Sequence, residues 1–120
     1  MKKEIKSEED VKKLVDSFYE KVNADPLLGP VFNSEAKVDW DEHLPKMYRF
    51  WGTQLIGTGD YKGQPFPPHM KLNIKPEHFQ RWVGLFVETV EEHFFGLTAE
   101  IAVQKARNIA NVFQFKLNLI

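Results

Sequence analysis

One of the four histidines in this 120-residue chain lies where the backbone should hold it in place. His69 follows residues 63–68, which contain three prolines, and precedes a helical-looking stretch over residues 70–74. Proline fixes its own φ angle, so such a loop presents the next residue in one orientation. Imidazole is the commonest protein ligand of transition metals and also binds haem iron. His69 is therefore a candidate metal ligand, although a histidine in a loop is more often only a loop residue.

The sequence offers little for other metal or nucleophilic sites. It contains no cysteine, which excludes thiolate ligands, thiol nucleophiles and disulfides. No two histidines lie four residues apart, and the His-Glu-x-x-His and Glu-x-x-His motifs are absent. No serine lies in a Gly-x-Ser-x-Gly turn, and the glycines of residues 57–63 lack phosphate-loop spacing. Zinc, di-iron and serine-nucleophile sites are all disfavoured.

The composition predicts one domain, residues 1–120, with a core that has room for a flat apolar group. Aromatic residues make up 13% of the chain, more than short helices need to cover one another. The net charge is -1 and the basic residues are scattered, which disfavours nucleic acid and membrane surfaces as partners. No segment reads as a secretory signal or a membrane span, so we expect a cytoplasmic protein.

Apolar residues recur at helical spacing and no segment alternates like a strand, so the predicted fold class is all-α. Ser7 is the expected cap of a first helix that ends near Pro26. Asp39 is the expected cap of a second helix. Pro45 complicates that helix, and we expect either a break at Leu44 or a new helix beginning at Pro45.

Two further helices are predicted after a long non-helical stretch over residues 57–69, a length usual for functional or disordered loops. Pro76 suits the first position of a helix whose apolar stripe runs from Phe79 to Phe94 and stops at Gly96. Thr98 is the expected cap of the last helix. The buried face of that helix is predicted to contain Ile101, Ala102, Ile109, Val112, Phe113 and Leu117.

Five short segments, in order along the chain, resemble one protein family. They are residues 18–22, 28–32, 43–51, 57–69 and 78–82, within residues 11–113. In these segments the chain resembles the truncated haemoglobins, and most closely their third, bacterial group. The family fold is a two-over-two helical sandwich around haem. One such segment would be weak evidence, whereas the ordered series is strong.

The resemblance implies haem b as cofactor and assigns roles to individual residues. It makes His69 the proximal iron ligand through Nε2, and it places Tyr19 and Trp82 on the distal side, facing a diatomic ligand. Their residue types alone fit ordinary core positions equally well. His43 corresponds to the histidine near the ligand entrance, and whether it contacts the ligand stays open. The haem pocket is expected to include Phe32, Met47, Phe50, Leu72, Ile74 and Phe79.

Reversible O2 binding is the activity that the resemblance implies, with NO, CO and cyanide as further ligands. Three distal donors would slow release, which favours oxygen scavenging over bulk oxygen transport. An alternative is an enzyme, either an NO dioxygenase or a peroxidase-like protein, that works with an unidentified reductase. A second alternative is a haem-free helical interaction or sensor domain that keeps only the scaffold.

Overall fold

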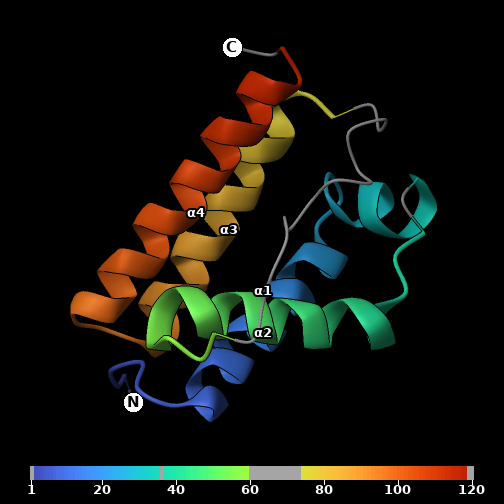
Figure 1. The fold of residues 1–120 in the computed structure, drawn as a ribbon. Helices are drawn as coiled ribbons and strands as arrows, with labels where there is room; N and C mark the ends of the chain where they lie inside the picture. Colours follow the sequence, from blue (N-terminus) through green and yellow to red (C-terminus); the bar gives the residue numbers. More distant parts are fainter. Residues whose placement is uncertain (1, 36, 60–73, 119–120) are drawn as a thin grey trace.

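The computed structural model describes residues 2–35, 37–59 and 74–118. Its elements are α1 (Glu8–Ala24), the π-helical turn η1 (Val31–Glu35), α2 (Trp40–Ile56), α3 (Pro76–His93) and α4 (Leu97–Lys116). Helix α1 packs on α2 and α3, while α4 packs on α3 and α2. Figure 1 shows α3 and α4 lying side by side, with α2 crossing in front of α1. The described residues form no strand, so the predicted all-α class is confirmed.

The expected bounds of α1 are confirmed. Ser7 is its N-cap and Asp25, the residue before Pro26, is its C-cap. Proline disfavours the helical conformation in the residue before it, and Asp25 accordingly has an extended backbone with ψ 129°. The buried face of α1 carries both Phe18 and Tyr19, and these two residues reach different parts of the core.

The prediction that Pro45 breaks the second helix is wrong. Helix α2 runs without interruption from Trp40 to Ile56 with Pro45 inside it, and Asp39 is its N-cap as expected. A proline removes the hydrogen bond to the carbonyl four residues earlier, which here belongs to Asp41. Asp41 is exposed in the first turn of α2, where water can replace the missing donor. The cost at this position is therefore small enough for the helix to continue.

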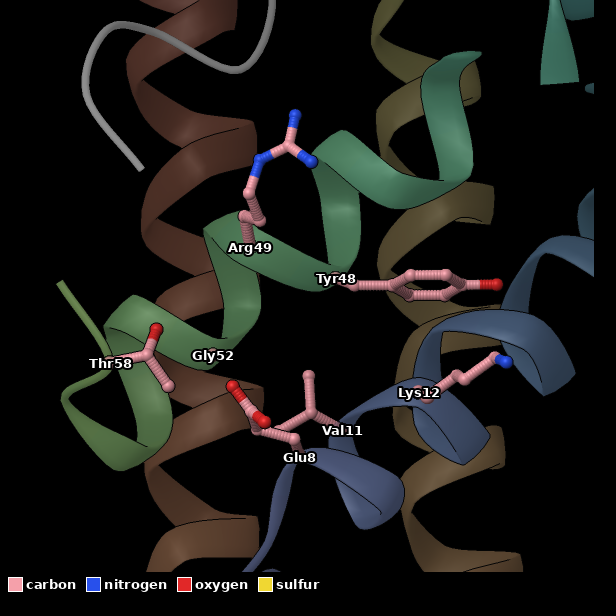
Figure 2. Close-up of a pocket in the computed structure, with 7 residues that line it drawn as sticks. All are labelled: Glu8, Val11, Lys12, Tyr48, Arg49, Gly52 and Thr58. Carbon is pink, nitrogen blue, oxygen red and sulfur yellow. The ribbon is translucent and has the colours of Figure 1, made fainter. Parts of the chain in front are cut away.

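Helices α1 and α2 are joined near Tyr48 of α2. Its hydroxyl donates a hydrogen bond to Asp16 of α1, and Lys12 of α1 lies 5.7 Å from the centre of its ring. Burial together with this hydrogen bond raises the pKa of Tyr48 to about 12. Figure 2 shows Tyr48 extending alongside Lys12 at the edge of a hollow of about 170 Å³. The hollow is lined by Glu8, Val11, Lys12, Tyr48, Arg49, Gly52 and Thr58.

The predicted end of α3 and the predicted cap of α4 are both wrong. Helix α3 begins at Pro76 as expected but ends at His93, three residues before Gly96, and Gly96 is the N-cap of α4. Thr98 lies inside α4. Gly96 has a φ of 97°, and a Cβ atom there would lie 3.0 Å from Oε1 of Glu4. The turn therefore requires glycine for its backbone angle and for the close approach of the N-terminal segment.

The buried face of α4 is made mostly of alanine. Ala102 and Phe113 are buried as predicted, and Ile109 and Leu117 pack against the core. Ile101 and Val112, by contrast, are 38% and 49% exposed, so their predicted burial is wrong. The positions that complete the buried face are Ala99, Ala106, Ala110 and Gln114. Small side chains let α4 approach α3 closely, and Ile101 and Val112 then face outward.

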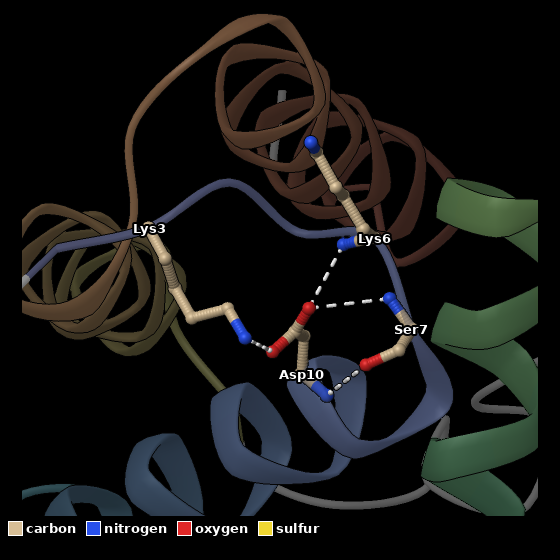
Figure 3. Close-up of polar contacts among 4 residues, drawn as sticks. All are labelled: Lys3, Lys6, Ser7 and Asp10. Carbon is tan, nitrogen blue, oxygen red and sulfur yellow. Dashed lines mark hydrogen bonds and ion pairs between the residues drawn. The ribbon is translucent and has the colours of Figure 1, made fainter.

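The N-terminal segment connects the α3–α4 turn to the start of α1 through Lys3. The Lys3 N–H donates to the His93 carbonyl at 3.2 Å, and the Lys3 carbonyl accepts from the Phe95 N–H at 3.0 Å. Its Nζ lies 2.8 Å from the Asp10 carboxylate, which also accepts from the backbone N–H groups of Lys6 and Ser7 (Figure 3). Asp10 thus completes a capping box while it holds Lys3 against the fold.

The Asp10 carboxylate should make folding dependent on pH. Burial opposes its ionisation, but the Lys3 ammonium and the N–H groups of Lys6 and Ser7 lower its pKa from 3.8 to about 2. A lowered folded-state pKa stabilises the protein above the unfolded-state value and loses that stabilisation as pH falls from about 4 to 2. Asp10→Asn should therefore cost on the order of 1–2 kcal/mol at pH 7, and less at pH 3.

Urea unfolding of the wild type and Asp10→Asn at pH 7, 5, 4 and 3 measures this difference. Lys3→Met, which removes the ammonium and keeps the carboxylate, should give a smaller loss with the same trend. A wild-type advantage that stays constant down to pH 3 would show that the Asp10 charge makes no contribution.

Candidate functional site

The structure brings two predicted site residues, Tyr19 and His43, together. Tyr19 of α1 is 2% exposed, and its ring centre lies 5.3 Å from that of the half-buried His43 on α2. The ring centre of Phe32 in η1 lies 6.1 Å from that of Tyr19. Trp40, the first residue of α2, lies 5.4 Å from Tyr19 and 5.5 Å from His43. These four residues, called the Tyr19 cluster below, join three elements.

Trp40 is a member of this cluster that the sequence analysis missed. Its ring is stacked on Phe32, with centres 5.9 Å apart and planes 21° apart. Residues three positions apart on a helix share a face, and Trp40 precedes His43 by three. With Asp39 recognised as the cap, that spacing was the signal available in the sequence.

The third predicted distal residue, Trp82, lies in a neighbouring aromatic group. It is 7% exposed on α3, and its ring meets the edge of Phe18 at 5.5 Å. Phe86 contacts Phe18 at 5.1 Å and stacks on Trp51 at 4.8 Å. This Phe18 cluster, made of Phe18, Trp51, Trp82 and Phe86, adjoins the Tyr19 cluster because the rings of Phe18 and Tyr19 are 4.9 Å apart.

Two polar groups of the site are buried among aromatic rings. The indole Nε1 of Trp82 is shielded from solvent and has no hydrogen-bond partner within residues 2–35, 37–59 and 74–118. Burial raises the pKa of the Tyr19 hydroxyl, with no hydrogen bond contributing to the shift. The phenol therefore keeps its proton at neutral pH. Both groups can donate a hydrogen bond to an acceptor that enters the core.

The turn that carries Phe32 is fixed by the buried carboxylate of Asp25. Its Oδ2 accepts from the N–H groups of Leu27 and Leu28 at 3.0 and 2.9 Å. Its Oδ1 lies 3.2 Å from Nη1 of Arg81 on α3. The Asp25 side chain thus accepts hydrogen bonds from the backbone that follows α1 and holds that turn against α3. This contact places η1 and Phe32 against Tyr19.

Most other predicted pocket residues are buried near these clusters. Met47, Phe50 and Phe79 are 4%, 6% and 6% exposed. Ile74 is half-buried, but it lies outside any helix, so the helical-looking stretch does not extend to residue 74. His69 and Leu72 lie outside the described residues, and their predicted roles stay predictions.

A groove of about 320 Å³ lies between α2 and α4 beside Phe50. Its lining combines apolar side chains with two lysines: Phe50, Gln54, Lys105, Asn108, Ile109, Val112, Phe113 and Lys116. Within the described ranges, no three histidine, aspartate or glutamate side chains are grouped closely enough to hold a metal ion. Over the same ranges, none of the helices has the length and apolar composition that crossing a membrane requires.

Comparison with known proteins shows the family. The model of the family described as bacterial-like globin matches residues 3–115. The chain belongs to this globin family. The group 3 truncated hemoglobin of Campylobacter jejuni is 39% identical to this globin over 118 residues, which cover 95% of this chain and 93% of that protein.

A solved structure also resembles this globin. The crystal structure of the group III truncated hemoglobin from Campylobacter jejuni matches it with a TM-score of 0.85 and 39% identity, covering 98% of this chain and 95% of that one. The predicted group III resemblance and two-over-two fold are confirmed. Membership of the globin family implies a haem cofactor and diatomic gases as ligands.

Removal of the Tyr19 hydroxyl should cost this globin little stability. Because burial raises the pKa of the hydroxyl and no hydrogen bond contributes to that shift, Tyr19→Phe should change the free energy of unfolding by less than about 1 kcal/mol when no gas ligand is present. Tyr48→Phe is the matched control, since it loses the bond to Asp16 and should cost about 1 kcal/mol or more. Urea unfolding compares them, and a larger loss for Tyr19→Phe would contradict the expectation.

Proposed function

We propose that the 120 residues form one globin domain that binds haem b and reversibly binds O2. His69 would hold the iron through Nε2, while Tyr19, Trp82 and His43 would face the gas. The bound haem would supply the iron centre at which a diatomic gas coordinates. A cysteine-free chain also fits a reducing cytoplasm, where we place the protein.

The buried indole N–H of Trp82 is the observation that carries this proposal. A polar group left without a partner inside a protein costs about 1–3 kcal/mol, and native cores rarely contain one. Trp82 has no acceptor in the described part of the chain although aromatic rings surround it. Retention of such a donor is expected where a ligand supplies the acceptor. A small diatomic gas is the ligand that its family implies.

The surrounding residues fit a haem. A flat macrocycle needs apolar walls, and the buried Phe32, Met47, Phe50 and Phe79 supply them, with the half-buried Ile74 near the start of α3. Leu72 is proposed as a further wall. The α2–α4 groove beside Phe50 adds Ile109 and Phe113 as apolar surface, and its lysines offer charges suited to carboxylates at the edge of a macrocycle.

The donors of the pocket favour slow release of the ligand over bulk transport. Each hydrogen bond contributes on the order of 1 kcal/mol, so two bonds together lengthen residence about tenfold or more. A protein that holds its ligand this long is better suited to scavenging O2 than to delivering it. NO, CO and cyanide are expected to enter the same pocket.

Haem binding through His69 can be tested by absorption spectroscopy. The purified full chain with added haem should show a Soret band, and His69→Ala should alter or abolish it. His93→Ala is the control, because the His93 side chain faces Glu92 at the end of α3. If His69→Ala does not fold, His69→Gly with added imidazole should recover the wild-type spectrum. An unchanged band in His69→Ala, or none in the wild type, would overturn the proposal.

The distal donors can be tested by ligand release. Tyr19→Phe and Trp82→Phe should each release O2 about fivefold faster, as expected for the loss of one hydrogen bond. Tyr48→Phe should release O2 at the wild-type rate, because its hydroxyl is bonded to Asp16 at the α1–α2 contact. Stopped-flow displacement of O2 by CO measures these rates. Unaltered release from both pocket variants would show that neither donor reaches the ligand.

The enzyme alternative is separated by turnover. The same polar pocket would serve NO dioxygenation or peroxide reduction, and each of these needs an electron donor such as a reductase. Nitrate that forms catalytically when NO is added to the protein in aerated buffer with a reductant would favour the dioxygenase. Stoichiometric or slow nitrate formation would favour O2 binding.

A further inference from the structure

Trp40 and His43 are the two half-buried members of the Tyr19 cluster. Tyr19 and Phe32, by contrast, are only 2% and 7% exposed. The Trp40 ring meets His43 at 82° and stacks on Phe32 at 21°. It therefore contacts three of the proposed pocket residues at once and is more exposed to solvent than the two that lie deepest.

A hydrogen bond holds the Trp40 ring in this position. Its indole Nε1 donates to Oδ1 of Asn33 at 2.8 Å, and Nδ2 of Asn33 donates to Oδ1 of Asn23 at 2.8 Å and to the Gly29 carbonyl at 3.0 Å. An indole nitrogen can only donate, so the amide of Asn33 must turn its oxygen toward Trp40. Asn33 thus connects the end of α1 and the following turn to the first residue of α2.

This connection is strong enough to hold Trp40 and weak enough to release it. Asn33 and Asn23 are exposed, so water competes for the same donors and acceptors. Breaking one such bond frees the Trp40 indole from Asn33, while the backbone of α2 keeps its own ladder and the Asp39 cap. The ring can then move without unfolding the helix that carries His43.

We propose that the hydrogen bond from Trp40 to Asn33, called the latch below, holds the Trp40 ring against His43 and across the outer side of the pocket. The ring thereby limits the rate at which a diatomic ligand enters. The inference rests on the proposed gas-binding function and deepens it. Trp40 acts through steric closure and through its contacts with Tyr19 and His43. It need not touch the iron or donate to the ligand.

Flash photolysis of the CO complex of the full-length haem protein tests the latch. Trp40→Phe removes the donor and keeps a ring, and Asn33→Ala removes the acceptor. Each should raise the CO association rate about fivefold, as for the loss of one hydrogen bond. Because both delete the same bond, the double variant should be no faster than either single variant. Trp40→Ala, which removes the ring as well, should be faster still.

Asn23→Ala is the matched control inside the same network. It breaks the link from Asn33 to α1 and leaves the bond from Trp40 to Asn33 in place. Its CO association rate should stay within about twofold of the wild type. If Asn23→Ala is as fast as Asn33→Ala, the effect comes from loosening of the turn, and the latch is refuted. Additive rates in the double variant refute it equally.

The indole signals give a second readout that does not depend on ligand binding. In a proton–nitrogen NMR spectrum, the Trp40 indole N–H should exchange with solvent faster in Asn33→Ala than in the wild type or Asn23→Ala. Equal exchange in all three overturns the latch while leaving gas binding intact. Absence of a Soret band overturns the proposed function and the latch together, whereas a Soret band with wild-type CO rates in every variant overturns the latch alone.

Discussion

Two adjacent residues of α1, Phe18 and Tyr19, hold the core together. Phe18 packs against Trp82 and Phe86 of α3, and Tyr19 packs against Phe32, Trp40 and His43 of η1 and α2. Neighbouring positions on a helix point about 100° apart, so one turn of α1 can serve both aromatic clusters. The packing of α1 against α2 and α3, and the nearness of Tyr19, His43 and Trp82 to one another, depend on this turn being buried.

The same burial costs free energy at two polar groups of the site. Aromatic rings gain much from leaving water, but a phenol hydroxyl and an indole N–H lose their hydration when they are buried. Tyr19 and Trp82 carry these groups into the core, and the described residues supply Trp82 with no acceptor. Phenylalanine in place of Tyr19 would keep the ring in the core without that cost. Under the proposed function, a small acceptor that enters the pocket would satisfy these polar groups, and the stability lost in the empty pocket would serve binding.

Local signals predicted the bounds of α1 because Ser7 and the Asp25–Pro26 pair act on their own neighbours. The error at Pro45 has a local cause, because Asp41 is exposed and the helix continues past the proline. The other errors arose where contacts between residues distant in the sequence decide the outcome. Gly96 ends no helix, since its conformation is adapted to Glu4, more than ninety residues earlier in the chain. Ile101 and Val112 were predicted on the buried face of α4 because they are hydrophobic. Most of that face consists of alanines, because the helices pack closely there. Helical spacing placed Tyr19, His43 and Trp82 on apolar faces, but their roles came from the family resemblance. Trp40 was missed although it lies one helical turn before His43.

The most direct test of the central claim, that Tyr19 and Trp82 donate to the gas, is the infrared stretching frequency of CO bound to the haem protein. Donors near the outer atom of the ligand lower this frequency, because they stabilise negative charge that develops there. We expect the wild-type frequency to lie below that of the Tyr19→Phe/Trp82→Phe double variant, with each single variant between them. The same frequency in all four proteins would contradict the claim, because the two buried donors would then have no contact with the ligand.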